Sequence, residues 1–385
     1  MNNLQQNKPK KKITFFLTSL VSGGEERTAS VLAKELSTKE ELIFVFFNKP
    51  IDFEIPKNVR VKILRPVYKW RLWRLLTLPL VVWRYYQFCQ TEKITHSIAF
   101  DSLPNFCNCL IKKMGWKGQA ILRESNHVTT RFPAATIRGK IFHWFIRNLY
   151  PAADLILVNA WRIGTDLQQQ YGIQIPIQLS LNPIDIAAIQ RLSQKTIVPK
   201  KQFTFIHVGM FRAQKNHLLL LQAFAEIKHL AVDLWLVGKG DLEAIIRAEI
   251  LRLGLPEKVL LKGFSPNPYQ FMAAADCMLL SSDYEGLPNV LSEGLACGLP
   301  IISTDCPSGP REIIAPDTDK KQKATTEIEL AKYGILTPVG NAEKLAEAMT
   351  YVYKNSKYRK GDFYKERVKP FSVETVVEKL LEELK

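Results

Sequence analysis

The chain has 385 residues and is poor in the features that mark several protein classes. Its best apolar run, residues 75–83, is about half the ~20 residues that a membrane-spanning helix needs, and Pro79 interrupts it. Six cysteines occur without a CxxC spacing, and the basic amino-terminal stretch shows no cleavage pattern of a secretory signal. We therefore expect reduced thiols in a cytosolic protein rather than a disulfide-rich secreted domain or an integral membrane protein.

Acidic residues are scarce in one half only. Residues 1–150 contain 25 Lys+Arg and 10 Asp+Glu, whereas residues 151–385 contain 28 and 27. This one-sided basic excess predicts an anionic partner: a membrane surface, a nucleic acid or a polyanionic substrate. The sequence contains no nucleic-acid-binding motif, so a nucleic-acid partner is not expected.

Apolar runs alternate with helical patterns along the whole chain. Residues 13–20 and 203–209 are apolar runs followed by a short loop and a helical pattern, which is the opening of a parallel α/β domain. The alternation predicts two doubly wound parallel sheets. The predicted boundaries are 1–185 for a basic first domain, 186–365 for a second domain, and 366–385 for a terminal amphipathic helix that can pack back on the first domain.

Glycines and cations follow the strands that open each half. Gly23 and Gly24 let backbone amides approach a phosphate at a helix N-terminus, although most such glycines only form turns. Arg212 and Lys215 occupy the matching position of the second half and suit a pyrophosphate, with solvated surface cations as the alternative. Gly238 also permits close backbone approach, but a plain turn is the favoured interpretation there.

Glu285 and Glu293 are the most informative pair. Glu285 follows an apolar run, and Glu293 lies in a predicted helix with its ends at Asn289 and Gly298. If that helix extended back to Glu285, both carboxylates would lie on roughly one face. They suit hydroxyls of a sugar or ribose; acid–base hydrolysis by paired carboxylates, a helix N-terminal acid and an exposed helical glutamate are the alternatives.

His127 lies just past a predicted strand, where a histidine can donate to or accept from a reacting group, although most lone histidines are structural. An Asp317–Asp319 pair resembles a DxD metal motif, but it lies in a lysine-rich loop with no strand before it. We therefore assign no metal to it.

Two runs combine aromatic and basic residues, at 65–88 and 138–150. Trp and Tyr favour the lipid headgroup region, and Lys and Arg bind anionic lipids, so both runs predict membrane contact, with a core helix as the alternative. The predicted contact residues are Trp70, Arg71, Trp73 and Arg74.

With these residues in place, the chain resembles the retaining glycosyltransferases of family 4, which have the GT-B fold of two facing Rossmann-like domains. The resemblance is carried by GGEERTASVLAKEL (23–36), ADLILVNA (153–160), NPID (182–185), VGMFRAQKN (208–216), GKGDLE (238–243), LKGF (261–264) and, most specifically, EGLPNVLSEGLACGLPIISTDCPSGPREII (285–314). It is strong in 200–315 and weaker in 40–150.

The resemblance implies that residues 1–185 form the acceptor-binding domain and residues 186–365 the donor-binding domain, and it implies a role for each matching residue. Glu285 would bind hydroxyls of the donor sugar, Glu293 the ribose, and Lys215 the diphosphate leaving group, while His127 would support the transition state. The family usually has Arg where this chain has Met210, and Arg212 is the candidate substitute. The other implied donor contacts are Gly23, Gly24, Gly238, Lys262, Phe264, Pro288, Asn289, Val290 and Leu291.

The expected function is therefore transfer of a hexose or N-acetylhexosamine from a UDP-sugar, without a metal or other cofactor. The expected acceptor is a lipid-linked oligosaccharide, lipopolysaccharide or another surface polysaccharide, and the expected location is peripheral, on the cytoplasmic face of the membrane. A UDP-sugar epimerase of GT-B fold and a non-enzymatic binder of anionic surfaces are the alternatives.

Overall fold

The structure is a computed structural model that describes residues 10–21, 23–48, 53–64 and 77–385. The chain forms two compact units. Unit 1 comprises Met1–Asn159, Ile163–Pro183 and Val376–Lys385, and unit 2 comprises Ala160–Arg162 and Ile184–Thr375. Both are built on seven-stranded sheets, so the predicted α/β class with two doubly wound sheets is confirmed.

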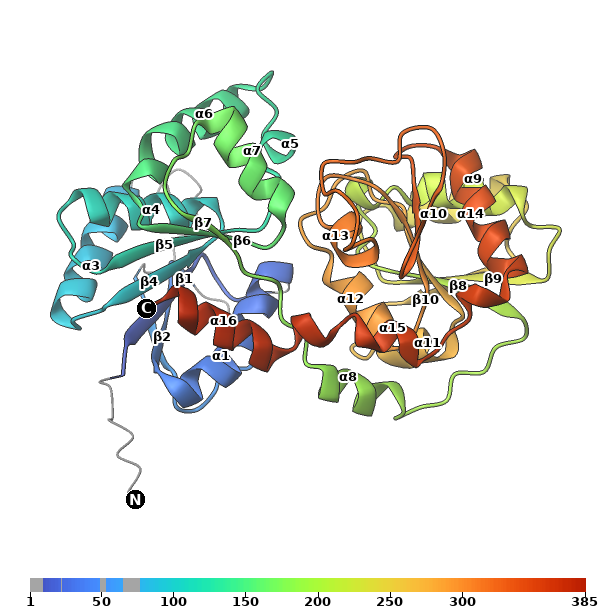
Figure 1. Cartoon of the computed structure of the whole chain (residues 1–385), viewed down its shortest axis with the longest axis horizontal. Coiled ribbons are helices and arrows are strands. Elements are labelled where there is room, and N and C mark those ends of the chain that lie inside the picture. Colours follow the sequence, from blue (N-terminus) through green and yellow to red (C-terminus); the bar gives the residue numbers. More distant parts are fainter. Residues whose placement is uncertain (1–9, 22, 49–52, 65–76) are drawn as a thin grey trace. The chain divides into compact units, whose positions relative to one another are not determined.

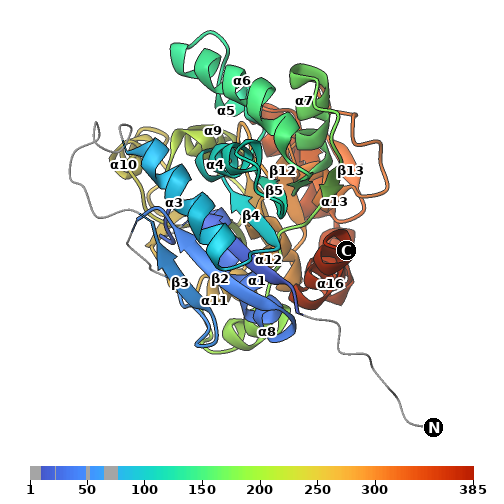
Figure 2. The same ribbon diagram turned by 90° about the vertical axis from the view of Figure 1, so that its left-hand side faces the viewer.

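Unit 1 contains an all-parallel sheet with the strand order β3-β2-β1-β4-β5-β6-β7. Helices cover both faces of such a sheet, which explains why its central strands are continuous apolar runs. Figure 2 shows β3 at the edge of the sheet beside β2. The strands are β1 (Lys12–Leu17), β2 (Glu41–Phe46), β3 (Arg60–Ile63), β4 (His96–Phe100), β5 (Gln119–Glu124), β6 (Leu155–Val158) and β7 (Ile177–Leu179).

The helices of unit 1 pack their apolar faces on this sheet. In the core between α3 and the sheet, the hydroxyl of Tyr85 lies 2.8 Å from Thr14 Oγ1 and 2.5 Å from Ser97 Oγ, so its polar end is satisfied. The helices are α1 (Gly24–Lys39), α3 (Leu78–Thr91), α4 (Ser102–Lys113), α5 (Val128–Arg131), α6 (Ile137–Leu149) and α7 (Trp161–Tyr171), whose first two residues belong to unit 2.

Unit 2 repeats the architecture with the strand order β10-β9-β8-β11-β12-β14-β13, in which only β13 is antiparallel. Its strands are β8 (Phe203–Val208), β9 (Val232–Val237), β10 (Val259–Gly263), β11 (Cys277–Leu280), β12 (Ile301–Thr304), β13 (Glu329–Ala331) and β14 (Gly334–Thr337). Its helices are α8 (Ile186–Ser193), α9 (His217–Glu226), α10 (Glu243–Arg252), α11 (Tyr269–Ala274), α12 (Asn289–Ala296), α13 (Pro310–Ile314), α14 (Ala342–Lys354) and α15 (Asp362–Glu366).

The last helix, α16 (Val373–Glu383), carries the chain back to unit 1 (Figure 1). The carbonyl of Leu384 accepts hydrogen bonds from His96 Nε2, at 3.1 Å, and from Lys11 Nζ. The end of the chain is therefore fixed next to β1 and β4.

Each sheet has one point at which the strand order reverses, between β1 and β4 in unit 1 and between β8 and β11 in unit 2. Ligands of open α/β sheets bind outside the carboxyl ends of the strands at such a switch point. The loops after these four strands are therefore the places to look for a site.

Candidate functional site

The switch point of unit 2 brings Lys215 and Glu285 together from the loops after β8 and β11. Lys215 Nζ lies 2.5 Å from Glu285 Oε1, and Ser282 Oγ donates to the same oxygen at 2.7 Å. Gln214 Nε2 lies 3.4 Å from the other carboxylate oxygen. Glu285 is only 8% exposed, so its charge is held by fixed donors rather than by water.

The backbone around Glu285 is fixed as firmly as its side chain. Its amide donates to the carbonyl of Pro307 at 2.6 Å, and its carbonyl accepts from the amide of Ser308 at 2.8 Å. Gly309 has φ +79°, and a Cβ there would lie 2.1 Å from the carbonyl oxygen of Gly286. Only glycine permits this close approach, which holds the loop after β12 against Glu285.

Helix α12 begins at Asn289, four residues after Glu285, so it does not extend back to that residue. Its N-terminus follows Pro288 and has no side-chain cap. Glu293 is buried on this helix, where the hydroxyl of Tyr269 in α11 lies 3.5 Å from Oε1. The two glutamates therefore have different neighbours: Glu285 contacts the loop after β8, and Glu293 faces α11.

The loops after β8, β9 and β10 form a continuous rim. A Cβ at Gly238, where φ is +153°, would lie 1.9 Å from the carbonyl oxygen of Gly209, so the two loops pack backbone against backbone. The amide of Phe211 donates to the carbonyl of Lys239 at 3.0 Å. Lys239 Nζ lies 5.0 Å from the ring centroid of Phe264, which is 65% exposed. An exposed ring on such a rim can stack on a planar ligand.

The remaining predicted donor residues lie in the loop after β8, in β10 and in α12. Lys262 Nζ is 4.5 Å from the ring centroid of Trp235. Arg212 and Met210 are both exposed, and in the described part of the chain the Arg212 side chain makes no hydrogen bond or ion pair. Val290 is partly buried in the first turn of α12, and Leu291 is fully buried.

His207 and His217, for which the sequence analysis predicts no function, lie side by side near Lys215. Their ring centroids are 4.5 Å apart, both are buried, and none of the four ring nitrogens has a hydrogen-bond partner among the described residues. Burial, with a smaller contribution from Lys215, lowers the pKa of His217 to about 4, and burial holds the pKa of His207 well below its usual value. Both rings are therefore neutral at physiological pH.

His127 lies at the carboxyl end of β5 in unit 1, where it precedes the short helix α5. Its Nδ1 lies 3.1 Å from Thr130 Oγ1 and 3.6 Å from a carboxylate oxygen of Asp166. Asp166 is buried on α7 and also accepts hydrogen bonds from Thr129. The ring of His127 thus lies beside a buried carboxylate, with its Nδ1 at hydrogen-bond distance from Thr130.

Gly23 precedes α1, as predicted. A Cβ at Gly23 would lie 2.1 Å from Glu26 Oε2, so the carboxylate of Glu26 folds back onto the start of its own helix. A carboxylate at a helix N-terminus stabilises the helix. Ligand contact by Gly23 and Gly24 stays a prediction.

The predicted membrane residues Trp70, Arg71, Trp73 and Arg74 lie outside the described residues. The second aromatic and basic run corresponds to α6, where Ile137, Ile141 and Trp144 are 80%, 49% and 60% exposed. These three residues share one helical face, since they are spaced by four and three positions. No helix in the described ranges is long and apolar enough to cross a membrane.

Asp317 and Asp319 show no metal-site geometry. Asp317 pairs with Lys332 at 3.3 Å, and Asp319 accepts from the amide of Lys321. No group of three or more His, Cys, Asp or Glu among the residues that the structure describes is arranged to hold a metal.

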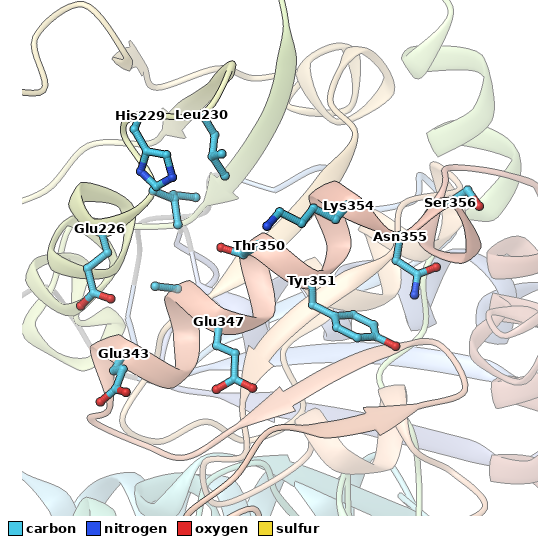
Figure 3. A pocket seen from close by; sticks show the side chains of 12 residues that line it. Glu226, His229, Leu230, Glu343, Glu347, Thr350, Tyr351, Lys354, Asn355 and Ser356 are labelled. Atoms are coloured by element: carbon cyan, nitrogen blue, oxygen red, sulfur yellow. The ribbon is translucent and has the colours of Figure 1, made fainter.

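A pocket of about 730 Å³ lies between α9 and α14, away from the loops described above (Figure 3). Its rim carries Glu226, Glu343 and Glu347 together with His229 and Lys354. It contains none of the residues predicted for the site.

Residues 188–361 match the family model described as Glycosyl transferases group 1. A relative from Campylobacter jejuni, named N-acetylgalactosamine-N,N'-diacetylbacillosaminyl-diphospho-undecaprenol 4-alpha-N-acetylgalactosaminyltransferase, is 31% identical over 368 residues, which cover 93% of this chain and 94% of the relative. The chain is also similar to the structure of sucrose-phosphate synthase from Thermosynechococcus elongatus, with a TM-score of 0.79 at 17% identity over 97% of this chain and 98% of that one. The structure of Anabaena HepE in complex with UDP is similar as well, with a TM-score of 0.74 at 19% identity. The match covers 97% of this chain and 99% of that one. At these identities the solved structures show the fold alone.

Proposed function

The chain belongs to the group 1 glycosyltransferases, of the family 4 type and GT-B fold, and on that premise we propose that it transfers a hexose or N-acetylhexosamine from a UDP-sugar to a lipid-linked oligosaccharide or similar surface-glycan acceptor. The Campylobacter relative is named for N-acetylgalactosamine transfer to a diphospho-undecaprenol-linked sugar. The HepE structure is described as a complex with UDP. Both names support this choice of donor and acceptor class.

The observation that carries the proposal is the contact between Lys215 and Glu285 at the switch point of unit 2. Glu285 offers a fixed carboxylate for donor-sugar hydroxyls, and Lys215 offers a cation for the diphosphate. In this assignment Glu293 binds the ribose, and the exposed ring of Phe264 stacks on the base.

The main chemical requirement is to stabilise the charge of the departing UDP, because the anomeric carbon becomes oxocarbenium-like as the bond breaks. Lys215, Arg212 and the backbone amides at the start of α12 would supply this stabilisation, and preorganised donors of this kind are usually the largest catalytic contribution. We propose that the acceptor hydroxyl attacks from the face that the diphosphate leaves and passes its proton to that diphosphate. The configuration is then retained without a metal.

The exposed apolar face of α6 supports peripheral membrane association. We propose the cytoplasmic face of the membrane as its location. Arg138, Lys140 and Arg147 lie on the same helix and are exposed. Apolar side chains flanked by cations bind anionic bilayers by burial of the apolar atoms and by attraction to the headgroups. Such an attachment would bring the enzyme to an acceptor that is anchored in the lipid.

The proposal is tested first by donor binding. UDP or a UDP-sugar present at 100 times its dissociation constant should stabilise the protein by about 2.7 kcal/mol, whereas GDP and ADP should have a smaller effect. Transfer from UDP-N-acetylgalactosamine or UDP-glucose to a polyprenyl-diphosphate-linked sugar should then be measured. Release of a changed free sugar without an acceptor would instead identify an epimerase, and absence of any stabilisation by uridine nucleotides would contradict the proposal.

A further inference from the structure

The loop after β12 is closed by an ion pair between the residues at its two ends. Asp305 directly follows β12, and its amide donates to the carbonyl of Thr337 in β14 at 2.8 Å, so it continues the sheet. Arg311 lies in the first turn of α13, and its Nη2 and Nε donate to Asp305 Oδ2 at 2.6 and 3.1 Å. The side chains of Arg311 and Asp305 are 1% and 0% exposed. The pair therefore fixes both ends of the loop 306–310.

The loop 306–310 holds the backbone of Glu285 from both sides. The carbonyl of Pro307 accepts from the amide of Glu285 at 2.6 Å, and the amide of Ser308 donates to the carbonyl of Glu285 at 2.8 Å. Ser308 Oγ lies 3.4 Å from the same carbonyl oxygen. The position of the Glu285 carboxylate therefore depends on where this loop is held.

The segment 316–331, which follows α13 and ends with β13, supplies the other partners of the ion pair. Arg311 Nη1 and Nη2 donate to the two carboxylate oxygens of Glu329, at 2.8 and 2.7 Å, and Nη1 also donates to Thr318 Oγ1 at 3.1 Å. The amide of Ala324 donates to Asp305 Oδ2 at 2.8 Å. One buried guanidinium thus joins the end of β12 to β13. Asp305, Arg311 and Glu329 are called the clasp below.

Stability alone is a weak reason to bury the charges of the clasp. Their desolvation cost is often no more than offset by their mutual attraction, and apolar residues of similar volume are often at least as stabilising. A guanidinium that binds two carboxylates does fix directions and distances, which apolar packing does not. All three nitrogens of the Arg311 guanidinium donate to protein groups, and the side chain is 1% exposed. Arg311 therefore acts on a ligand only through the loop that it holds.

We propose that the clasp positions Glu285 for the donor sugar, so that Asp305 and Arg311 are positioning residues of sugar transfer. This inference rests on the proposed function, in which the carboxylate of Glu285 binds hydroxyls of the sugar. The diphosphate and the base are assigned there to Lys215 and Phe264, which lie on the loops after β8 and β10. A loosened clasp should therefore weaken recognition of the sugar more than recognition of UDP.

The test compares Asp305→Asn and Arg311→Lys with the wild type, each as the full chain. Asparagine keeps an oxygen for the amide of Ala324 but removes the charge. Lysine keeps the charge but lacks the fork that binds two carboxylates at once. Asp317→Asn is the control, because it removes an exposed ion pair between the segment 316–331 and Lys332 and leaves the clasp intact.

Calorimetry measures the dissociation constants of UDP and of a UDP-sugar, either UDP-N-acetylgalactosamine or UDP-glucose, whichever the wild type binds more tightly. In Asp305→Asn and Arg311→Lys the dissociation constant of the UDP-sugar should rise about 10-fold or more relative to that of UDP, while Asp317→Asn matches the wild type. Partial unfolding would lower the active fraction for both ligands alike, so the ratio of the two constants reports the contact with the sugar. An unchanged ratio in both variants would overturn the inference.

Amide hydrogen exchange followed by mass spectrometry tests the clasp without any nucleotide. Peptides that contain Glu285 should exchange faster in Asp305→Asn and Arg311→Lys, because the hydrogen bond from the Glu285 amide to Pro307 opens more often. Peptides from β1 in unit 1, and all peptides of Asp317→Asn outside its own loop, should exchange as in the wild type. Unchanged exchange at Glu285 would also overturn the inference.

These outcomes are separable from a failure of the proposed function. A wild type that binds no uridine nucleotide contradicts the proposed function, whereas faster exchange at Glu285 in the two clasp variants still supports the positioning role of the clasp. A protein that transfers sugar, with the same ratio of dissociation constants and the same exchange in wild type and clasp variants, supports the transfer and overturns the positioning role.

Discussion

Lys215 and Glu285 form an ion pair whose nitrogen and oxygen atoms are 2.5 Å apart, although 70 positions of sequence separate them. The pair joins the two loops at the switch point of unit 2. A buried carboxylate and its cation are thus already ordered, and a UDP-sugar would have to share Lys215 rather than recruit it. Preorganisation of this kind reduces the reorganisation that accompanies charge development.

Replacement of Lys215 by alanine should therefore affect both activity and stability. Removal of one preorganised charge donor should lower the turnover number about 100-fold or more. It also leaves Glu285 buried without its cation, which should lower the melting temperature. Transfer kinetics and a thermal melt check the two effects, and Lys228→Ala, which removes only a contact with the carbonyl of Leu253, is the control. Sugar transfer at the wild-type rate by Lys215→Ala would refute the assigned role.

Phe264→Ala should weaken binding of UDP. Stacking of a base on an aromatic side chain contributes about 1–3 kcal/mol, so the dissociation constant of UDP should rise between about 5-fold and 150-fold. Calorimetry with UDP measures the change, and Phe264→Tyr should restore most of the affinity. Phe363→Ala, at another half-exposed ring of unit 2, provides the comparison. If both alanine variants bound UDP equally well, the base would lie elsewhere.

Glu124 should make unit 1 less stable at higher pH. Its pKa rises from the usual 4.5 to about 7 in the folded protein, so the folded state holds a proton that the unfolded state releases. The free energy of unfolding should fall as pH rises from 4.5 to 7, by an amount on the order of 3 kcal/mol. Glu124→Gln, which mimics the protonated acid, should remove this dependence in denaturant titrations at pH 5, 6, 7 and 8. A variant that kept the wild-type slope would show that other groups cause it.

His217 should produce the opposite slope in unit 2. Its pKa falls from the usual 6.5 to about 4, so the unfolded state binds a proton that the folded state excludes. Stability should therefore be complete above pH 6.5 and decrease as pH falls towards 4, again on the order of 3 kcal/mol. His217→Phe, which keeps a flat ring beside Phe211, should reduce the loss. Part of the stability loss at low pH should remain in His217→Phe, because the pKa of His207 is lowered in the same direction. An unchanged acid slope in His217→Phe would contradict this explanation.

The α6 face should direct membrane binding. Ile141→Glu and Trp144→Glu together should reduce capture of the protein by liposomes that contain anionic lipid, because the change removes apolar contact and adds repulsion. Flotation of liposomes through a density gradient measures the captured fraction. Ile197→Glu changes the side chain that is 92% exposed in the segment before β8 and should leave capture unaffected. Equal loss in the control variant would indicate a nonspecific charge effect.

The fold and the positions of the loops at the switch point of unit 2 were largely predictable, because their sequence signals are local. The strands of both sheets are recognisable in the sequence as continuous apolar runs. The helix that carries Glu293 begins at Asn289, as expected. The motif from Glu285 to Glu293 has a fixed spacing within one continuous segment, so it can be recognised without knowledge of the fold.

The charged residues at the carboxyl edge of the sheet in unit 1 were missed for a physical reason. Glu25, Asp101, Glu124 and Arg131 are brought together only by the crossing connections of the sheet, and no spacing in the sequence relates them. His207 and His217 were also missed, because burial without partners is a property of packing rather than of residue type. The amphipathic pattern of α16 predicts a helix but does not determine which unit it packs against. The contact that fixes its end, between His96 and Leu384, joins residues 288 positions apart.

The return of the chain to unit 1 has a consequence for synthesis. Nascent domains generally fold as units, with the amino-terminal one first, as they leave the ribosome. Here Val376–Lys385 belongs to unit 1, so that unit cannot be completed until all of unit 2 has been translated. Unit 1 therefore begins to form before unit 2 but is completed after it, and β1 and β4 lack the contacts of Leu384 until that segment has been translated.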